Sequence, residues 1–117
     1  MRSLIHKVDA IYIPNDNTVF SALPKLIQIA NAQKIPTFTS DPDSVKLGVT
    51  ACYGYSQYHV GQTAGALAAK ILRGGDLGQL KVRSPENADI FINAKTAKIL
   101  DLKTPSHFKN TKITVVD

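Results

Sequence analysis

The sequence predicts an α/β fold, with a mainly parallel sheet flanked by helices. Short apolar runs suited to buried strands alternate with segments of helical periodicity, a pattern typical of parallel sheets. The clearest unit begins with the apolar run at residues 9–13, turns through the polar residues 15–17 and enters a helical pattern at Val19. The length of 117 residues favours one domain, so we expect a single α/β domain over residues 1–117.

The first third of the chain is expected to form two helical segments around a strand. Apolar residues within positions 4–8 have the spacing of the last turns of a helix. The helical pattern from Val19 to Ala32 has one apolar stripe, but Pro24 lacks a backbone N–H and clashes with a preceding turn. The regular helix is therefore predicted to begin near Ser21, so that Pro24 lies in its first turn.

We predict four strands from the short apolar runs. They are Ala10–Ile13, Pro36–Thr39, Val49–Tyr53 and Asp89–Ile92. The first two are joined by a helix, and such a crossover connects parallel neighbours. A single helical turn at Ser44–Leu47, closed by Gly48, should precede the third strand.

The second half of the chain is expected to contain two further helices. The first, His59–Leu72, carries a stripe of small residues and ends at Gly74-Gly75. A polar connection over residues 76–87 follows, with Leu80 and Val82 as a short extended piece. Asn93 is placed to cap the second helix, Ala94–Leu100. The last apolar residues, at 113, 115 and 116, alternate weakly.

The composition excludes several functional classes. The net charge is +5, but the basic residues are scattered, which argues against a nucleic-acid interface. The single cysteine, Cys52, permits no internal disulfide and is expected to be a small core residue, and the three histidines lack ligand spacing. We therefore expect no metal, no cofactor and no catalytic residue. No apolar run has the length of a bilayer span or of a signal-peptide core, so the chain as written would stay in the cytoplasm.

Polar side chains follow the first two predicted strands. In parallel sheets, ligands bind outside the carboxyl ends of the strands, where these side chains should cluster and hydrogen-bond a small polar ligand. The candidates are Asn15, Asp16, Asn17, Ser40 and Asp41. The alternative is that they only form turns and cap helices, which their residue types favour.

The order of these segments resembles a known family. The segments are residues 9–18, residues 35–41, the pattern Gly54-x-x-x-Tyr58-x-x-Gly61 and the stretch Asn93-x-x-x-Ala97-x-x-Leu100. Together they are similar to the C-terminal part of ABC-transporter substrate-binding proteins of the type I periplasmic binding protein fold. The closest group is the one linked to aromatic amino acid uptake. The resemblance runs from about Leu4 to about Phe108.

The resemblance implies two α/β lobes with a ligand in the cleft between them. Asp16 would pair with the ammonium group of an amino acid, and Asn17 would hydrogen-bond its carboxylate or the turn itself. Tyr55 and Tyr58 are candidates for stacking on the ligand, although Tyr58 is equally suited to anchoring a core. An ABC permease is the implied partner, and the periplasm or cell surface the implied location.

The resemblance also implies that this chain holds less than half of such a protein. The missing N-terminal lobe or a second copy of the chain would then be a partner. The helix at 59–72 belongs with the other lobe in the family. Here it would fold back onto its own sheet or be exchanged with a second copy, and we expect self-association. Alone, the chain should bind an amino acid weakly at best, and a truncated product without function is a further reading.

Two other functions compete with a ligand-binding module. A ligand-sensing regulatory domain can use the same fold, although no DNA-binding helix pair precedes the predicted sheet. An enzyme would need a reactive set, and the only candidate is the acid pair Asp16 and Asp41, which suits magnesium-dependent chemistry. We rank the binding module first, the regulator second and the enzyme third.

Overall fold

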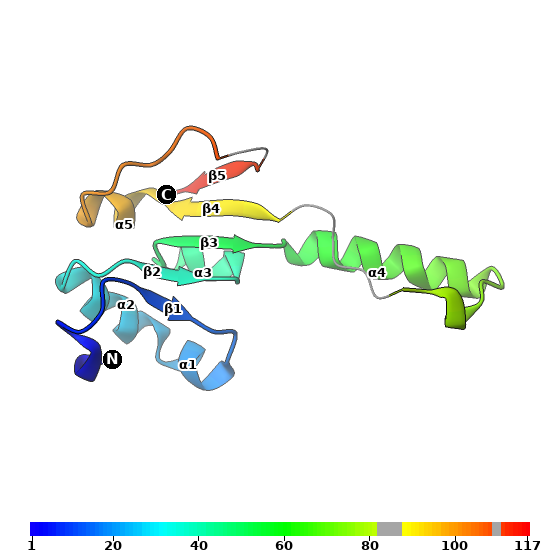
Figure 1. Ribbon diagram of the computed structural model, residues 1–117, viewed down its shortest axis with the longest axis horizontal. Helices are drawn as coiled ribbons and strands as arrows, with labels where there is room; N and C mark the ends of the chain where they lie inside the picture. Colours follow the sequence, from blue (N-terminus) through cyan, green and yellow to red (C-terminus); the bar gives the residue numbers. More distant parts are fainter. Residues whose placement is uncertain (82–87, 109–110) are drawn as a thin grey trace.

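The computed structural model describes residues 1–81, 88–108 and 111–117. In these residues a sheet of five strands has the order β1-β2-β3-β4-β5. The strands are β1 (Ile11–Ile13), β2 (Thr37–Thr39), β3 (Ala51–Gly54), β4 (Asp89–Asn93) and β5 (Ile113–Val116). The helices are η1 (Arg2–Leu4), α1 (Asn17–Ser21), α2 (Leu23–Ala32), α3 (Pro42–Lys46), α4 (Gln57–Leu72), η2 (Leu77–Gln79) and α5 (Ala94–Ile99). The predicted α/β class is confirmed (Figure 1).

The sheet is mainly parallel, as predicted. β1 pairs with β2, β2 with β3 and β4 with β5 in parallel register. The antiparallel pairing of β3 with β4 was not predicted. It arises because the chain leaves β3 at its carboxyl end and comes back to the sheet at that same end, where Asp89 pairs with Gly54.

Pro24 divides the predicted first helix in two. α1 ends at Ser21, Ala22 has non-helical dihedrals, and Pro24 occupies the first turn of α2. The break follows from the missing N–H and the ring of Pro24, neither of which an unbroken helix tolerates. The predicted place of Pro24 is therefore confirmed, while the helix at residues 1–8 is reduced to the short η1.

The core lies between β1, β2 and α2. Leu23, Ile27 and Ala30 are buried on one face of α2, and the first two pack against Ile11 and Ile13 of β1. Their spacing of four and three residues is that of one helical stripe. Figure 1 shows α2 and α3 behind the sheet, so these two helices cover one face of β1–β3.

β3 begins two residues later than the predicted third strand. Thr50 N–H donates to Thr37 Oγ1 at 3.2 Å, and Thr37 N–H donates to Thr50 Oγ1 at 3.0 Å. These buried side chains replace the backbone pairing between Thr37 and Thr50, and β3 starts at Ala51. The other predicted boundaries agree to within about two residues, and Asn93 caps α5 as predicted, with its Oδ1 accepting from Thr96 N–H at 2.8 Å. Val82 lies outside the described residues.

α4 extends away from the sheet (Figure 1). This 16-residue helix begins at Gln57, where Ser56 Oγ accepts from His59 N–H at 3.2 Å, and none of its residues is buried. The idea that the helix folds back onto its own sheet is therefore wrong. The molecule is elongated as a result, with extents of 56 × 33 × 22 Å.

Candidate functional site

The carboxyl ends of β1, β2 and β3 lie at one edge of the sheet. Ile13 pairs with Thr39, and Thr39 pairs with Cys52, all in parallel register. The segments that leave these strands therefore start side by side, and we call this edge the exit edge. It carries Asn15, Asp16 and Asn17 after β1, Ser40 and Asp41 after β2, and Tyr55 after β3. Their common position follows from the register, while their binding of a ligand stays a prediction.

Asp16 is the N-cap of α1 and keeps one carboxylate oxygen available. Its Oδ1 accepts from Thr18 N–H at 2.8 Å and from Val19 N–H at 3.1 Å. Oδ2 has no hydrogen-bond partner among the described residues, and the side chain is exposed. Asp16 is thus a cap, as the alternative held, and it also presents a free negatively charged oxygen at the exit edge.

The side chain of Asp41 is held more firmly than that of Asp16. Its Oδ2 accepts from Ser44 N–H at 2.9 Å and from Ser44 Oγ–H at 2.5 Å, which caps α3. Its own N–H donates to Thr39 Oγ1 at 3.2 Å. The residue is half-buried, so its main role in this chain is to fix the loop between β2 and α3.

Gly54 lets the ends of β2 and β3 approach closely. A Cβ built on Gly54 would lie 2.2 Å from the backbone oxygen of Ser40, far inside contact distance. Any side chain at this position would displace the loop that carries Ser40 and Asp41. The geometry of the exit edge therefore depends on a glycine here.

The two tyrosines of the site are placed differently. Tyr55 directly follows β3 and is half-buried at the exit edge. Tyr58 lies in the first turn of α4 and is 70% exposed, so it anchors no core in this structure. Gln62 Nε2 donates to its hydroxyl at 3.2 Å, and the His59 ring lies edge-on at 5.9 Å between centroids. The structure brings Tyr55 to the exit edge and leaves Tyr58 on the helix that departs from it.

Asp89 is a site candidate that sequence reasoning missed. It pairs with Gly54 and so adds a half-buried acidic residue to the exit edge. Only the antiparallel return of β4 brings it there. A parallel β4 would have placed Asp89 at the opposite edge, so the strand pattern alone carried no signal for it.

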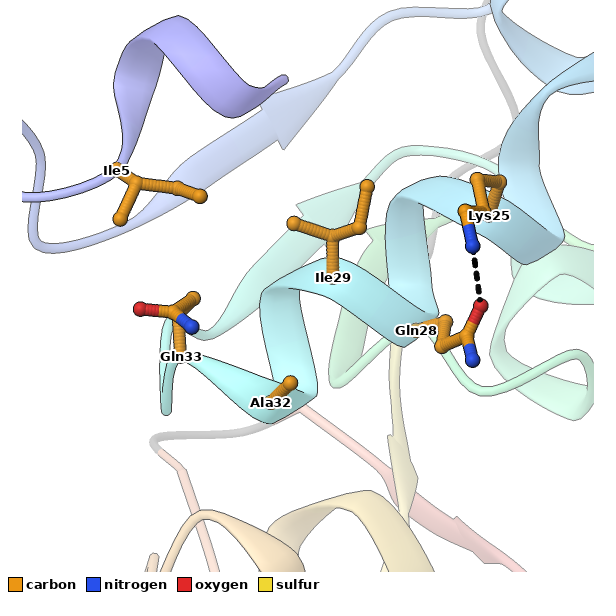
Figure 2. A pocket seen from close by; sticks show the side chains of 6 residues that line it. All are labelled: Ile5, Lys25, Gln28, Ile29, Ala32 and Gln33. Atoms are coloured by element: carbon orange, nitrogen blue, oxygen red, sulfur yellow. Dashed lines mark hydrogen bonds between the residues drawn. The ribbon is translucent and has the colours of Figure 1, made fainter.

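A shallow hollow of about 370 Å³ lies elsewhere, between residue Ile5 and the outer side of α2 (Figure 2). Its lining includes Ile29, Ala32 and Gln28, whose Oε1 accepts from Lys25 Nζ at 3.0 Å. It shares no residue with the exit edge. A smaller hollow of about 180 Å³ does adjoin the edge, where Ser56 and Gln57 face α3, β4 and β5.

The described ranges contain no cluster of His, Cys, Asp and Glu side chains that could hold a metal ion. Within the same residues, no helix is both long and apolar enough to cross a membrane. The groups that gather at the exit edge are carboxylates, amides, hydroxyls and one aromatic ring. These are the groups that recognise a small zwitterionic or polar ligand.

Cys52 is expected to be unreactive in the folded chain. Burial, together with the negative charge of Asp41, raises the pKa of its thiol to about 12. The thiolate is the nucleophile, so iodoacetamide at pH 8 should alkylate Cys52 at least ~100-fold more slowly in the folded chain than in urea. Because the folded pKa lies above the unfolded one, the free energy of unfolding should fall as the pH rises from about 9 toward about 12.

Mass spectrometry of timed samples measures the two alkylation rates. A Cys52→Ser chain that carries Ser3→Cys provides an exposed thiol as the control, and its rate should change little on unfolding. Equal rates for folded and unfolded Cys52 would contradict the burial that the structure describes.

The sequence matches the family model described as ABC transporter substrate binding protein over residues 1–115. A tyrosine-binding protein of Clostridioides difficile is 38% identical over 101 residues, which are 86% of this chain and 29% of that protein. An uncharacterized protein of Rickettsia prowazekii is 32% identical over 92 residues, which are 79% of this chain and 30% of that protein. The chain thus spans less than a third of the length of these relatives.

Solved structures agree with the sequence matches. A ligand-free, open substrate binding protein with adhesive properties from Clostridium difficile superposes with a TM-score of 0.79 at 32% identity. That match covers 99% of this chain and 39% of the solved one. An ABC domain in complex with L-Trp from Streptococcus pneumonia superposes with a TM-score of 0.78 at 26% identity, over 97% of this chain and 39% of that chain.

Proposed function

Because this chain belongs to the ABC transporter substrate binding protein family, we propose that it forms one wall of a cleft that binds an aromatic amino acid. Relatives named for tyrosine binding and solved with L-Trp support this ligand class. In this proposal the chain acts in the periplasm or at the cell surface, and the cleft delivers its ligand to an ABC permease.

The observation that carries the proposal is the common exit edge of β1, β2 and β3. The free Oδ2 of Asp16 is available to pair with the ligand's ammonium group, since Oδ1 alone satisfies the cap. Asn15 and Asn17 supply amide groups for the carboxylate. Tyr55 offers a ring on which an aromatic side chain can stack.

The remaining residues of the exit edge support these groups. Asp41, held by Ser44, fixes the neighbouring loop so that Ser40 keeps its place beside Gly54. Preorganised loops lose less conformational freedom on binding, which increases affinity. Tyr58 contacts the ligand only if the other wall of the cleft brings it close to the first turn of α4.

The carboxylate of Asp16 can be tested separately from its capping role. Asp16→Asn keeps a side-chain oxygen that caps helices about as well as Asp, but removes the negative charge. The loss of a hydrogen bond to a charged group should cost about 1.5–3 kcal/mol, or roughly 10- to 150-fold in the dissociation constant. The melting temperature should stay unchanged.

Calorimetric titration with L-tyrosine and L-tryptophan measures this effect in a complete protein. We suggest a chimera in which this chain replaces the matching 39% of the open Clostridium difficile protein. Asp43→Asn is the control, because Asp43 is exposed and pairs with Lys46 at 2.8 Å. An unchanged dissociation constant for Asp16→Asn would reduce Asp16 to a cap and remove it from the site.

A further inference from the structure

Asp89 is an acidic side chain without a partner in the described part of the chain. It begins β4 and is half-buried, yet its carboxylate takes part in no hydrogen bond or ion pair with any described residue. Its register partner on β3 is Gly54, which has no side chain to cover it. On the other side, Ile90 N–H donates to the backbone oxygen of Lys112 at 2.9 Å, but the Lys112 ammonium forms no ion pair with Asp89. A half-buried carboxylate has lost part of its hydration, so a donor that reaches it stabilises it.

The side chain of Asp89 lies on the face of the sheet that α3 covers. Side chains at every second position of a strand point to the same face, so Asp89 shares its face with Phe91 and Asn93. Asn93 Nδ2 donates to the backbone oxygen of Val45 in α3 at 2.8 Å, which identifies that face. Phe91 lines the hollow of about 180 Å³ that adjoins the exit edge, so there is open space on this side of β4.

Asp16 lies at the same edge and on the same face. β4 starts at the end of the sheet from which α4 departs, which is the exit edge (Figure 1). Asp16 caps α1, and Val19 and Phe20 of α1 pack against the core between β1 and α2. The two carboxylates therefore lie at opposite ends of the exit edge, with Asp16 after β1 and Asp89 at the start of β4.

The spacing of these two carboxylates suits the length of an aromatic amino acid. β1 and β4 are three strand intervals apart, which at about 4.8 Å each give about 14 Å between the strand ends. The two aspartate side chains shorten this gap from both sides. Tyrosine, extended from its ammonium group to its phenol and with a hydrogen bond of about 2.8 Å at each end, spans a similar distance. Tyr55 follows β3, which lies between these strands, and is therefore placed to contact the ring.

We propose that Asp89 selects, among aromatic amino acids, the ligands that carry a hydrogen-bond donor on the ring. This inference rests on the proposed function, in which Asp16 pairs with the ammonium group at the other end of the ligand. The hydroxyl of tyrosine, or the indole N–H of tryptophan, donates to the Asp89 carboxylate. Phenylalanine has no donor there and leaves the carboxylate covered by the ring and without a partner. Sites that hydrogen-bond a ligand group reject analogues that lack it, because the polar groups of the site are then left unpaired.

Calorimetric titration of the chimera with L-tyrosine and L-phenylalanine tests this inference. We expect the parent chimera to bind tyrosine at least about tenfold more tightly than phenylalanine. Asp89→Ala should reduce this preference to less than about threefold by weakening tyrosine binding alone, whereas Asp89→Asn, which keeps an acceptor, should retain part of the preference. Lys112→Ala is the matched control, because it removes a charge beside Asp89 but no acceptor, and it should leave the preference unchanged.

A second titration needs no variant and so does not depend on how a variant folds. O-Methyl-L-tyrosine has no donor on its ring, so it should bind the parent chimera no more tightly than phenylalanine does. The inference would be overturned if the parent bound tyrosine and phenylalanine equally, if its preference survived Asp89→Ala, or if Asp89→Ala weakened both ligands alike. In each of these cases the chimera still binds amino acids. Failure of the proposed function is distinct, because the parent chimera would then bind none of the three ligands and both proposals would fall.

Discussion

The isolated chain is expected to bind L-tyrosine about a hundredfold more weakly than the chimera that contains it. This factor in the dissociation constant corresponds to about 3 kcal/mol of binding free energy. Small-ligand sites usually bury most of the ligand's surface. The exit edge offers one wall, and Asp16 on it is exposed. An ion pair between exposed groups contributes only about 0.2–1 kcal/mol, because water competes for both partners.

Calorimetry on both proteins in the same buffer measures the difference. L-Alanine serves as a control ligand, since it has the ammonium and carboxylate groups but no ring to stack on Tyr55. Equal affinities for the isolated chain and the chimera would show that one wall suffices, and the two-wall account would then be wrong.

The local elements of the fold could be predicted from the sequence because their signals are local. Pro24 marks the first turn of α2, and Asn93 is placed to cap α5. The parallel pairing of β1 and β2 follows from the helix that joins them. Each of these features depends on residues that are close together in the chain.

The long-range features could not be predicted in the same way. The direction of β4 depends on where the chain returns after α4, and no residue of β4 itself encodes that point. The stripe of small residues predicted in α4 is present, but none of the residues of α4 is buried. The sequence therefore predicted the pattern of small residues in α4, but not what this pattern contacts.

The candidate site also has a part that could be predicted from local sequence and a part that could not. The residues after β1 and β2 were predicted because Asn, Asp and Ser after an apolar run are recognisable turn and cap residues. That Asp16 satisfies its cap with one oxygen, whereas Asp41 is held by Ser44, is a matter of three-dimensional geometry. Asp89 was missed because it reaches the exit edge through a pairing of residues 35 positions apart.

Gly54→Ala is expected to disrupt the exit edge without altering a polar group. The new methyl group would lie 2.2 Å from the backbone oxygen of Ser40 and 3.2 Å from the sulfur of Cys52, so both neighbours would have to move. The first of these is backbone in the loop held by Asp41, which gives way less easily than a flexible side chain. Overpacking of this kind costs typically about 1–3 kcal/mol.

We expect Gly54→Ala to lower the free energy of unfolding of the isolated chain by about 2–3 kcal/mol. In the chimera it should also reduce amino acid affinity, because the loop that carries Ser40 and Asp41 is displaced. Urea unfolding of dilute protein, followed by tyrosine fluorescence, measures the first effect. Equal stability of the Gly54→Ala and parent chains would mean that β2 and β3 separate freely at this edge.

Gly61→Ala is the matched control, and its effect on the free energy of unfolding is expected to differ between the isolated chain and the chimera. In the isolated chain the added methyl group meets no atom within 4 Å, so α4 should gain about 0.5–1 kcal/mol from the better helix former. In the chimera, an element of the other lobe that approaches this side of α4 would be displaced by the same methyl group, so the gain should be lost. A Gly61→Ala change that stabilised the isolated chain and the chimera alike would show that no element of the other lobe approaches α4 on this side.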